Sequence, residues 1–398
     1  MTDTIAVVCA LIAAAGLIQA GAGLIVLLRH QAARPLEPAA RPPVTVLKPL
    51  HGDEPLLEQA LATFCAQNYP VFQIVFGVQN PADPALHTLA RLRTRYPDVD
   101  MTIVVDSTPH GPNHKIANLI NMFGAAKHDT LVIADSDIHA APDYLDRLTG
   151  TLAQPGVGLV TTLYAGLPAH AGVAGAMGAS HINHSFLPGA LLARAMGRQD
   201  CLGATMALTR RTLQDVGGLL ALSHHLADDA VLGRLVAERG LTVALAATIP
   251  LTTIPEEEIG ALLEHELRWA RTIRSLVPVG FALSIMQFPI VWAAVAVGLS
   301  GGEAWSWSVF AAAWSGRAAI ACAMDRVLAV VSHPLALWWM PARDLMSVAV
   351  ITASYRTNRV AWRGQTLRAI PPPRVIQTLA ANTAMNPDMG YAQGMTPP

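Results

Sequence analysis

The stretch "KIANLINMFGAAKHDTLVIADSD", residues 115–137, decides the fold class. Residues 115–127 have the apolar periodicity of a helix. Residues 129–137 form a short apolar run that ends in Asp135 and Asp137. A helix followed by a continuously apolar strand is typical of a parallel sheet that is covered on both faces. The stretch therefore predicts an α/β domain.

The same alternation extends from residue 44 to residue 255. We expect strands at 44–50, 72–79 and 101–106 and helices at 53–67 and 83–96. Asp53 is expected to cap the first of these helices, with Pro55 in its first turn. The prediction is a Rossmann-like catalytic domain, with a mainly parallel sheet, over residues 44–255.

Acidic residues fall where such a domain binds its ligand. Ligands of parallel sheets bind outside the carboxyl ends of the strands. The acidic residues expected at these ends are Asp83, Asp106, Asp135 and Asp137.

Composition indicates that part of the chain faces lipid. Of its 398 residues, 52% are hydrophobic and only 14% are charged, against about 25% charged residues in ordinary soluble proteins. Residues 5–28 carry no charge and are long enough to span a bilayer. A signal peptide is the competing interpretation, but the chain begins "MTDT", with Asp3 in place of a basic segment. We expect a transmembrane anchor at 1–34 and a Pro-rich linker at 35–43.

The C-terminal third, residues 277–355, is also expected to contact the membrane. Residues 277–299 are uncharged and predict a span, whereas 305–324 carry Arg317, which is unfavourable at mid-bilayer. The following segments are short or broken by His-Pro, which suits re-entrant or interfacial elements. Arginines after the anchor and in the tail, 356–398, place the N-terminus outside and the catalytic domain and tail in the cytoplasm. Two or four crossings after residue 276 are then required.

Asp135 and Asp137 are candidate metal ligands. If the strand continues through them, both side chains point to one side. Mg²⁺ typically uses one or two carboxylates together with the phosphates of a substrate. The alternative is that these residues satisfy a turn or cap the next helix.

A second acidic pair, Asp228 and Asp229, lies in "LADDAVLG", residues 226–233. Adjacent carboxylates repel one another, so the fold must supply water, a cation or a shared proton. For Asp228 the alternative is a surface residue at a helix start. Lys115 either reaches a phosphate oxygen or is a solvated lysine at the start of its helix.

Residues 256–276 predict an amphipathic helix. His265, Arg268 and Trp269 share one of its faces. An arginine over a diphosphate would neutralise charge on a leaving nucleotide. The alternative is a basic helix on the membrane surface, an assignment that we prefer for Arg271 and Arg274.

Several motifs, in order and spacing, resemble the ceramide glucosyltransferase family (glycosyltransferase family 21). The motifs are "VTVLKPLHGDEP", "NPADPA", "HGPNHKIANLINM", "IADSD", "LADD" and "HELRW". Within that family the sequence is most similar to the bacterial glycosyltransferases of hopanoid biosynthesis. The animal ceramide enzymes have Gln in place of His265 and Gly in place of Asp137, and these departures weaken a ceramide assignment.

The resemblance implies a GT-A fold, a UDP-sugar donor, a lipid acceptor and a divalent cation, Mg²⁺ or Mn²⁺. It implies that Asp83 contacts the uridine part and that Asp135 lies at the metal and diphosphate, with Asp137 as a further metal ligand. Asp229 corresponds to the general base. The resemblance thus implies Asp229, His265, Arg268 and Trp269 as catalytic residues and Asp83 and Asp135 as substrate-binding residues. From their positions beside these residues we add Lys115, which could reach a phosphate oxygen, and Asp228, whose charge could raise the pKa of Asp229, to the substrate-binding set.

The expected function is inverting transfer of N-acetylglucosamine from UDP-GlcNAc to bacteriohopanetetrol, by a multi-pass protein of the bacterial inner membrane. Ceramide glucosylation is the alternative within the family. An inactive lipid-binding scaffold, a processive polysaccharide synthase and a phosphohydrolase are alternatives from other classes. Net charge is −1 and basic residues are dispersed, so nucleic acid is not an expected partner.

Overall fold

The structure is a computed structural model that describes residues 2–34, 36, 40–331, 333, 335–357, 359–362 and 365–368. Strands and helices alternate from residue 44 to residue 254, as expected. The strands of the main sheet are β1 (Val44–Pro49), β2 (Phe72–Val78), β3 (Asp100–Val105), β4 (Thr130–Ala134), β6 (Val157–Thr161), β8 (Thr205–Thr209) and β9 (Thr242–Leu245).

Within the described residues, this sheet has the order β3-β2-β1-β4-β8-β6-β9. Strands β3, β2, β1 and β4 are parallel neighbours, and β6 is parallel to β9. Strand β8 runs antiparallel to both β4 and β6. The prediction of an α/β domain with a mainly parallel sheet is therefore confirmed, and β8 is the exception to the parallel direction.

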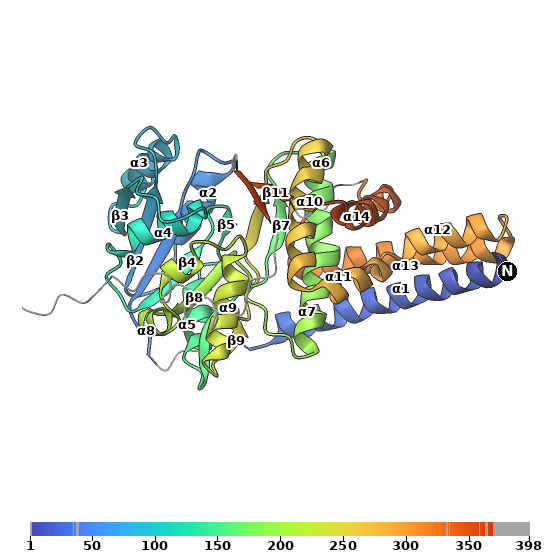
Figure 1. Cartoon of the computed structure of the whole chain (residues 1–398), viewed down its shortest axis with the longest axis horizontal. Helices are drawn as coiled ribbons and strands as arrows, with labels where there is room; N and C mark the ends of the chain where they lie inside the picture. The colour runs from blue at the N-terminus through green and yellow to red at the C-terminus, as the bar shows by residue number, and fades with distance from the viewer. Residues whose placement is uncertain are drawn as a thin grey trace, which may run out of the picture.

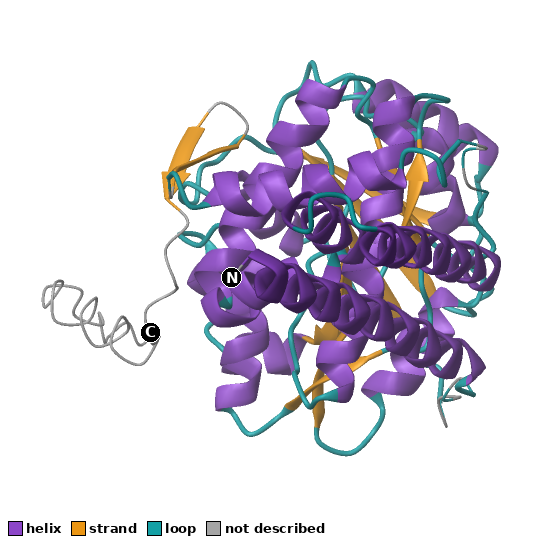
Figure 2. Ribbon diagram, turned by 90° about the vertical axis from the view of Figure 1, so that its right-hand side faces the viewer, coloured by secondary structure: helices purple, strands orange, loops and turns teal. Residues whose placement is uncertain are grey.

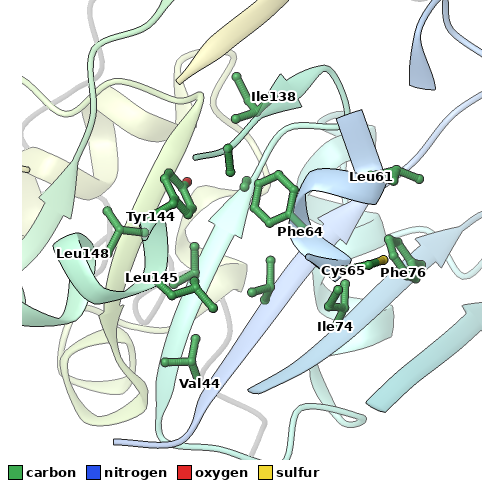
Figure 3. Packing of buried hydrophobic residues seen from close by; sticks show 14 of the residues in the cluster. Val44, Leu61, Phe64, Cys65, Ile74, Phe76, Ile138, Tyr144, Leu145 and Leu148 are labelled. Carbon is green, nitrogen blue, oxygen red and sulfur yellow. The ribbon is translucent and has the colours of Figure 1, made fainter. Parts of the chain in front are cut away.

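Helices cover both faces of the sheet, which explains its continuously apolar strands. One face carries α2 (Leu57–Cys65), α3 (Ala85–Arg95) and α5 (Tyr144–Leu152). The other carries α4 (His114–Phe123), α8 (Arg210–Asp215), the 3₁₀ helix η2 (Leu219–Leu222) and α9 (Asp228–Glu238). Figure 3 shows the first of these cores, where the edge of the Phe64 ring meets Tyr144 with the centroids 5.5 Å apart.

A small second sheet lies beside the carboxyl end of β4. It has the order β5-β10-β7, formed by β5 (Ile138–His139), β10 (Leu251–Ile254) and β7 (Ala165–Pro168). Strand β5 follows β4 after one turn, and β10 leads into the helix of the "HELRW" motif. The small sheet therefore connects the acidic "IADSD" motif after β4 with the basic "HELRW" motif of α10. A short hairpin, β11 (Arg359–Trp362) with β12 (Gln365–Arg368), falls within the predicted tail; apart from this hairpin and residues 356–357, the tail lies outside the described residues.

Two upright helical segments separate the sheet domain from a bundle of long helices (Figure 1). The first consists of α6 (Val173–His181), the π-helix η1 (Ile182–Phe186) and α7 (Leu187–Ala195). The second is α10 (Ile259–Leu276), against which α14 (Met340–Ser354) packs. The long helices α1 (Thr2–Ala32), α12 (Pro289–Leu299) and α13 (Ala304–Leu328) contact one another and project away from the sheet, and Figure 2 looks along them from the N-terminal end.

The apolar segments differ in how well they could cross a membrane. Among the described residues, α1 is the single unbroken helix long and apolar enough to do so. The expected span at 277–299 is broken: α11 (Pro278–Leu283) and the 3₁₀ helix η3 (Ser284–Gln287) meet α12 at an angle of 65°. Pro289 stands at the break, where its ring prevents the helix from continuing. Helix α13 is long enough, but it keeps Arg317 buried against its neighbours.

Several element boundaries differ from the sequence predictions; α10, for example, begins at Ile259 and not at residue 256. Helix α2 begins at Leu57, because Leu56 has a φ of 61° and interrupts the helix; Asp53 is no cap and instead accepts a hydrogen bond from Thr88 Oγ1 at 3.0 Å. Helix α4 ends at Phe123, four residues early. Strand β4 ends at Ala134, so Asp135 and Asp137 lie in the turn after it and not on the strand.

Candidate active site

Asp135 stands at the centre of a charged cluster at the carboxyl end of β4. Its Oδ1 lies 2.6 Å from the ammonium nitrogen of Lys115, which projects from the first turn of α4. Lys115 also donates to the carbonyl of Gly203 at 3.4 Å and lies 4.0 Å from Asp228. Burial alone would lower the pKa of Lys115, but Asp135 and Asp228 together raise it above its ordinary value. Lys115 is thus a permanent cation within the site, and the alternative of a solvated lysine is wrong.

The second acidic pair comes to the same place from α9. Asp228 is 6% exposed, and Asn113 donates its side-chain amide to Asp228 Oδ1 at 3.2 Å. The interpretation of Asp228 as a surface residue is therefore wrong, although the residue does begin a helix. Asp229 lies against Gly203, where an added Cβ would stand 3.0 Å from Asp229 Oδ2. Burial, and then the charge of Asp228, raises the pKa of Asp229 to about 6.

Asp137 is held from the small sheet. Thr252 of β10 donates its hydroxyl to Asp137 Oδ2 at 2.5 Å, and the backbone N–H of Thr253 donates to the Asp137 carbonyl at 3.1 Å. Burial, and then the charge of Asp135, raises the pKa of Asp137 to about 6. Two carboxylates that repel each other in a half-buried turn suit a hard divalent cation. Within the part of the chain that the structure describes, no third acidic, histidine or cysteine ligand joins them, so a metal here would need donor phosphates or water to complete its coordination.

Sequence reasoning overlooked Lys48, which lies beneath this turn. Lys48 is fully buried in β1, and its ammonium donates to the backbone carbonyl of Asp135 at 2.6 Å while lying 3.6 Å from the centre of the Phe64 ring. Burial lowers the pKa of Lys48 to about 7, although Asp137 and Asp135 oppose this shift. The signal in the sequence was a single charged residue inside the apolar strand "VTVLKPL".

Strand β10 continues from Asp137 into the motif helix α10. Glu256 follows β10, and His265 of α10 donates its Nδ1–H to Glu256 Oε1. The ring of His265 packs edge-on against Trp269, with centroids 4.6 Å apart, which confirms that these two share a face. Burial acts to raise the pKa of Glu256. The hydrogen bond from His265 and the charge of Arg268 outweigh burial, so the pKa lies below its ordinary value. Glu256 is the second functional candidate that sequence reasoning missed.

Aromatic side chains connect α10 with the acidic cluster. The ring of Phe186, from η1, lies 6.4 Å from Trp269 and 5.2 Å from Tyr164. Burial, followed by the charges of Asp137 and Asp229, raises the pKa of Tyr164 above its usual range, so the tyrosine remains neutral. Tyr164, Phe186 and Trp269 thus form a row of ring contacts that extends from α10 toward the carboxylates.

Two predicted residues lie outside this constellation. Asp83 is buried at the start of α3, where its carboxylate accepts from the backbone N–H groups of Gly52 at 3.0 Å and Ala85 at 2.9 Å. These hydrogen bonds hold the loop after β1 to the start of α3. Arg274 faces α14, with its guanidinium 4.9 Å from the Tyr355 ring and a hydrogen bond of 3.2 Å to the Thr357 carbonyl.

Comparison with known proteins gives a family match over nearly the whole chain. The description "Glycosyl transferase family 21" applies to residues 7–375. Ceramide glucosyltransferase 1 of Caenorhabditis elegans is 23% identical over 239 residues, which are 60% of this chain and 51% of the worm protein. Ceramide glucosyltransferase of Candida albicans is 34% identical over 114 residues, 26% of this chain and 21% of the yeast protein. The matched region spans about half, or less, of the length of these relatives.

Solved structures give more distant similarities. Mannosyltransferase PcManGT from Pyrobaculum calidifontis, in complex with GDP-Man and Mn²⁺, has a TM-score of 0.47 and 20% identity, covering 88% of this chain and 99% of that chain. Glucosyl-3-phosphoglycerate synthase from Mycobacterium tuberculosis, in complex with Mn²⁺, UDP and phosphoglyceric acid, has a TM-score of 0.39 and 16% identity, covering 59% and 78%.

Proposed function

Because this chain belongs to glycosyl transferase family 21, we propose that it transfers a sugar from a UDP-sugar to a hydroxyl group of a lipid, with residues 44–255 as a GT-A catalytic domain. The observation that carries the proposal is the path from Asp137 along β10 to His265 and Trp269. This path supports a single site formed by the turn after β4 and the motif helix α10.

In this mechanism Asp229 is the general base. Its carboxylate removes the proton of the acceptor hydroxyl while that oxygen forms a bond to the anomeric carbon of the sugar. The bond from this carbon to the diphosphate oxygen breaks, and UDP leaves with the electron pair. Lys115 and Arg268 supply positive charge toward the departing diphosphate. His265, held by Glu256, and Trp269 form the wall of the site on the α10 side.

Asp135 and Asp137 would hold a divalent cation, Mg²⁺ or Mn²⁺. When bound, the cation would neutralise charge on the diphosphate of the donor. The carboxylate of Asp137 is already oriented by Thr252, whereas that of Asp135 is paired with Lys115. Lys48 holds the backbone of this turn in place by donating a hydrogen bond to the Asp135 carbonyl.

For the substrates, the likeness of the motifs to the hopanoid branch supports N-acetylglucosamine transfer to bacteriohopanetetrol. Glucosylation of ceramide is the second candidate, because the curated relatives are ceramide glucosyltransferases. The apolar helix α1 and the broken α11–α12 segment support attachment to a membrane. The arginines after α1 support a cytoplasmic catalytic domain, and the likeness to the hopanoid branch supports a bacterial inner membrane.

Purified protein in lipid nanodiscs tests these assignments. UDP-GlcNAc and UDP-glucose are each incubated with bacteriohopanetetrol and with ceramide, and the lipids are analysed by mass spectrometry. We expect one glycosylated lipid to dominate, and it should be the hopanoid carrying N-acetylglucosamine. A dominant glucosylceramide would transfer the assignment to the second candidate. Absence of any glycolipid in all four mixtures would contradict the function.

A further inference from the structure

A polar pocket lies within the helical bundle, on the side of η1 that faces α1 and α13. Its empty volume, which includes space open to solvent, is about 250 Å³. Its lining residues are Gln19, Ala20, His184, Ser185, Pro188, Gly189, Leu192, Gln287 and Arg317. The surrounding helices are predominantly apolar, so a group of polar side chains among them requires an explanation.

Arg317 has hydrogen-bonding capacity that its neighbours do not use. Its side chain is 3% exposed, and Nη2 donates to Ser185 Oγ at 3.1 Å. Among the described residues, Nε and Nη1 have no hydrogen-bond partner, although both are buried. A buried donor without a partner is unfavourable. An arginine within apolar helices is therefore a candidate ligand-binding residue.

The charges around Arg317 indicate what kind of ligand it takes. Asp344 Oδ1 lies 3.9 Å from Nη2 of Arg317, and Asp325 accepts from His184 at 2.7 Å. The second guanidinium of the cluster, on Arg343, is already paired through two hydrogen bonds of 2.7 Å with Glu266. The two guanidinium groups thus face three carboxylates, so a further anion would be disfavoured. Hydroxyl or amide oxygens of an uncharged ligand would satisfy Arg317.

The helical segment that contains the π-helix η1 lies between this pocket and the proposed active site. His184 and Ser185 face the pocket, whereas the next residue, Phe186, contacts Tyr164 and Trp269. A π-helical turn of this kind is frequent at functional sites. On α1, Gln19 lies next to exposed apolar side chains at Leu11, Ile18 and Ile25, which recur every seven residues and could accompany a hydrocarbon tail.

We propose that this pocket takes the uncharged, hydroxyl- or amide-bearing head of the acceptor lipid, with Arg317 as its principal hydrogen-bond donor. The inference rests on the proposed function for the identity of the lipid as acceptor. Binding itself requires neither donor sugar nor turnover, and this separates the two claims experimentally.

The test is photolabelling of the full-length protein in phosphatidylcholine nanodiscs with a diazirine-bearing ceramide, without UDP-sugar. Labelled peptides should come from η1, α13 or the middle of α1. Arg317→Gln should reduce labelling roughly tenfold or more, because a hydrogen bond from a charged group is lost. Gln19→Leu changes an exposed side chain and should reduce labelling less. Arg326→Gln, on the exposed side of the same helix, is the matched control and should label like the wild type.

Retained UDP binding by each variant verifies that the protein is folded. Bacteriohopanetetrol should compete with the probe, whereas the anionic lipid phosphatidylglycerol should not. Equal labelling of Arg317→Gln and Gln19→Leu with the wild type, or displacement of the probe by phosphatidylglycerol alone, would overturn the inference. Labelling of the wild type without transfer in any of the four substrate mixtures would instead contradict the proposed function and leave the binding site intact.

Discussion

Asp228 and Asp229 are neighbours in the chain, but the fold gives them different surroundings. Asn113 and Lys115 face Asp228, whereas Asp229 lies beside Gly203, whose missing side chain leaves its carboxylate room. The sequence could predict that this pair is chemically important, since two adjacent acids need compensation. It could not predict that Asp228 is buried, because the compensating groups lie more than 110 residues earlier in the chain.

We expect Asp229→Asn to lower kcat by about 10²–10⁴-fold, the usual contribution of a general base. Donor binding, measured by calorimetry with UDP, should change little. Asp228→Asn is the matched control, since it removes the same charge at the adjacent position, and it should reduce kcat much less. A reversal of the two results would assign the base to Asp228.

The pH dependence of kcat should follow Asp229. Its pKa is raised to about 6 by burial and by Asp228, and the base acts in its ionised form, so activity is present above about pH 6 and falls as the pH drops through that value. Asp228→Asn removes one cause of the raised pKa, so the acid limb should move to lower pH. An acid limb that does not move would show that Asp228 does not influence the base. The measurement is the pH–rate profile of both proteins at saturating substrates.

Chelation tests the metal assignment. Asp135 and Asp137 repel each other in a half-buried turn, and a divalent cation would remove this repulsion. EDTA should abolish transfer, and Mg²⁺ or Mn²⁺ should restore it; Asp137→Asn should remain folded but require more metal for half-maximal activity. Full transfer in EDTA would exclude a metal role for the pair.

At the scale of elements, the alternation of strands and helices was predictable from apolar patterns. The residues at which several helices and strands begin or end were not predictable. Helix α2 begins late because Leu56 adopts a left-handed conformation, a feature that Asp53 and Pro55 did not indicate. The break at Phe288–Pro289 turns the most apolar C-terminal segment through 65°, although hydropathy alone favoured a single span. The direction of β8 was also not predictable, since it depends on the helical segment α6–η1–α7 that precedes it.

Helices α10 and α14 are joined by the buried pair Glu266–Arg343, with exposures of 6% and 3%. Glu266→Gln should destabilise their packing by about 3–5 kcal/mol, because it leaves a buried guanidinium without its counter-charge. Glu264→Gln, two residues away and exposed on the same helix, should have little effect. Thermal unfolding in detergent measures both. Equal stability of the two variants would show that the pair is not needed for packing.

At the scale of the whole molecule, the predicted orientation in the membrane is directly testable. Cys9, Cys65 and Cys201 are buried and Cys322 is partly buried. With Cys322→Ser in each variant, an introduced cysteine on the surface should dominate labelling. Thr2→Cys should react with an impermeant maleimide in intact spheroplasts. Gln154→Cys, exposed at the end of α5, should react only after permeabilisation. Labelling of Gln154→Cys in intact spheroplasts would reverse the orientation.

The close packing of α7 against α1 limits how the protein can be prepared for biochemistry. Leu187 and Leu191 of α7 share a buried cluster with Leu27 of α1 and Met324 of α13. Helix α7 lies inside the stretch 44–255, so a fragment limited to these residues would expose this apolar surface to solvent. Such a fragment would aggregate or require detergent even though it contained no membrane-crossing helix. Purification should therefore retain α1 and begin with detergent screening of the intact chain.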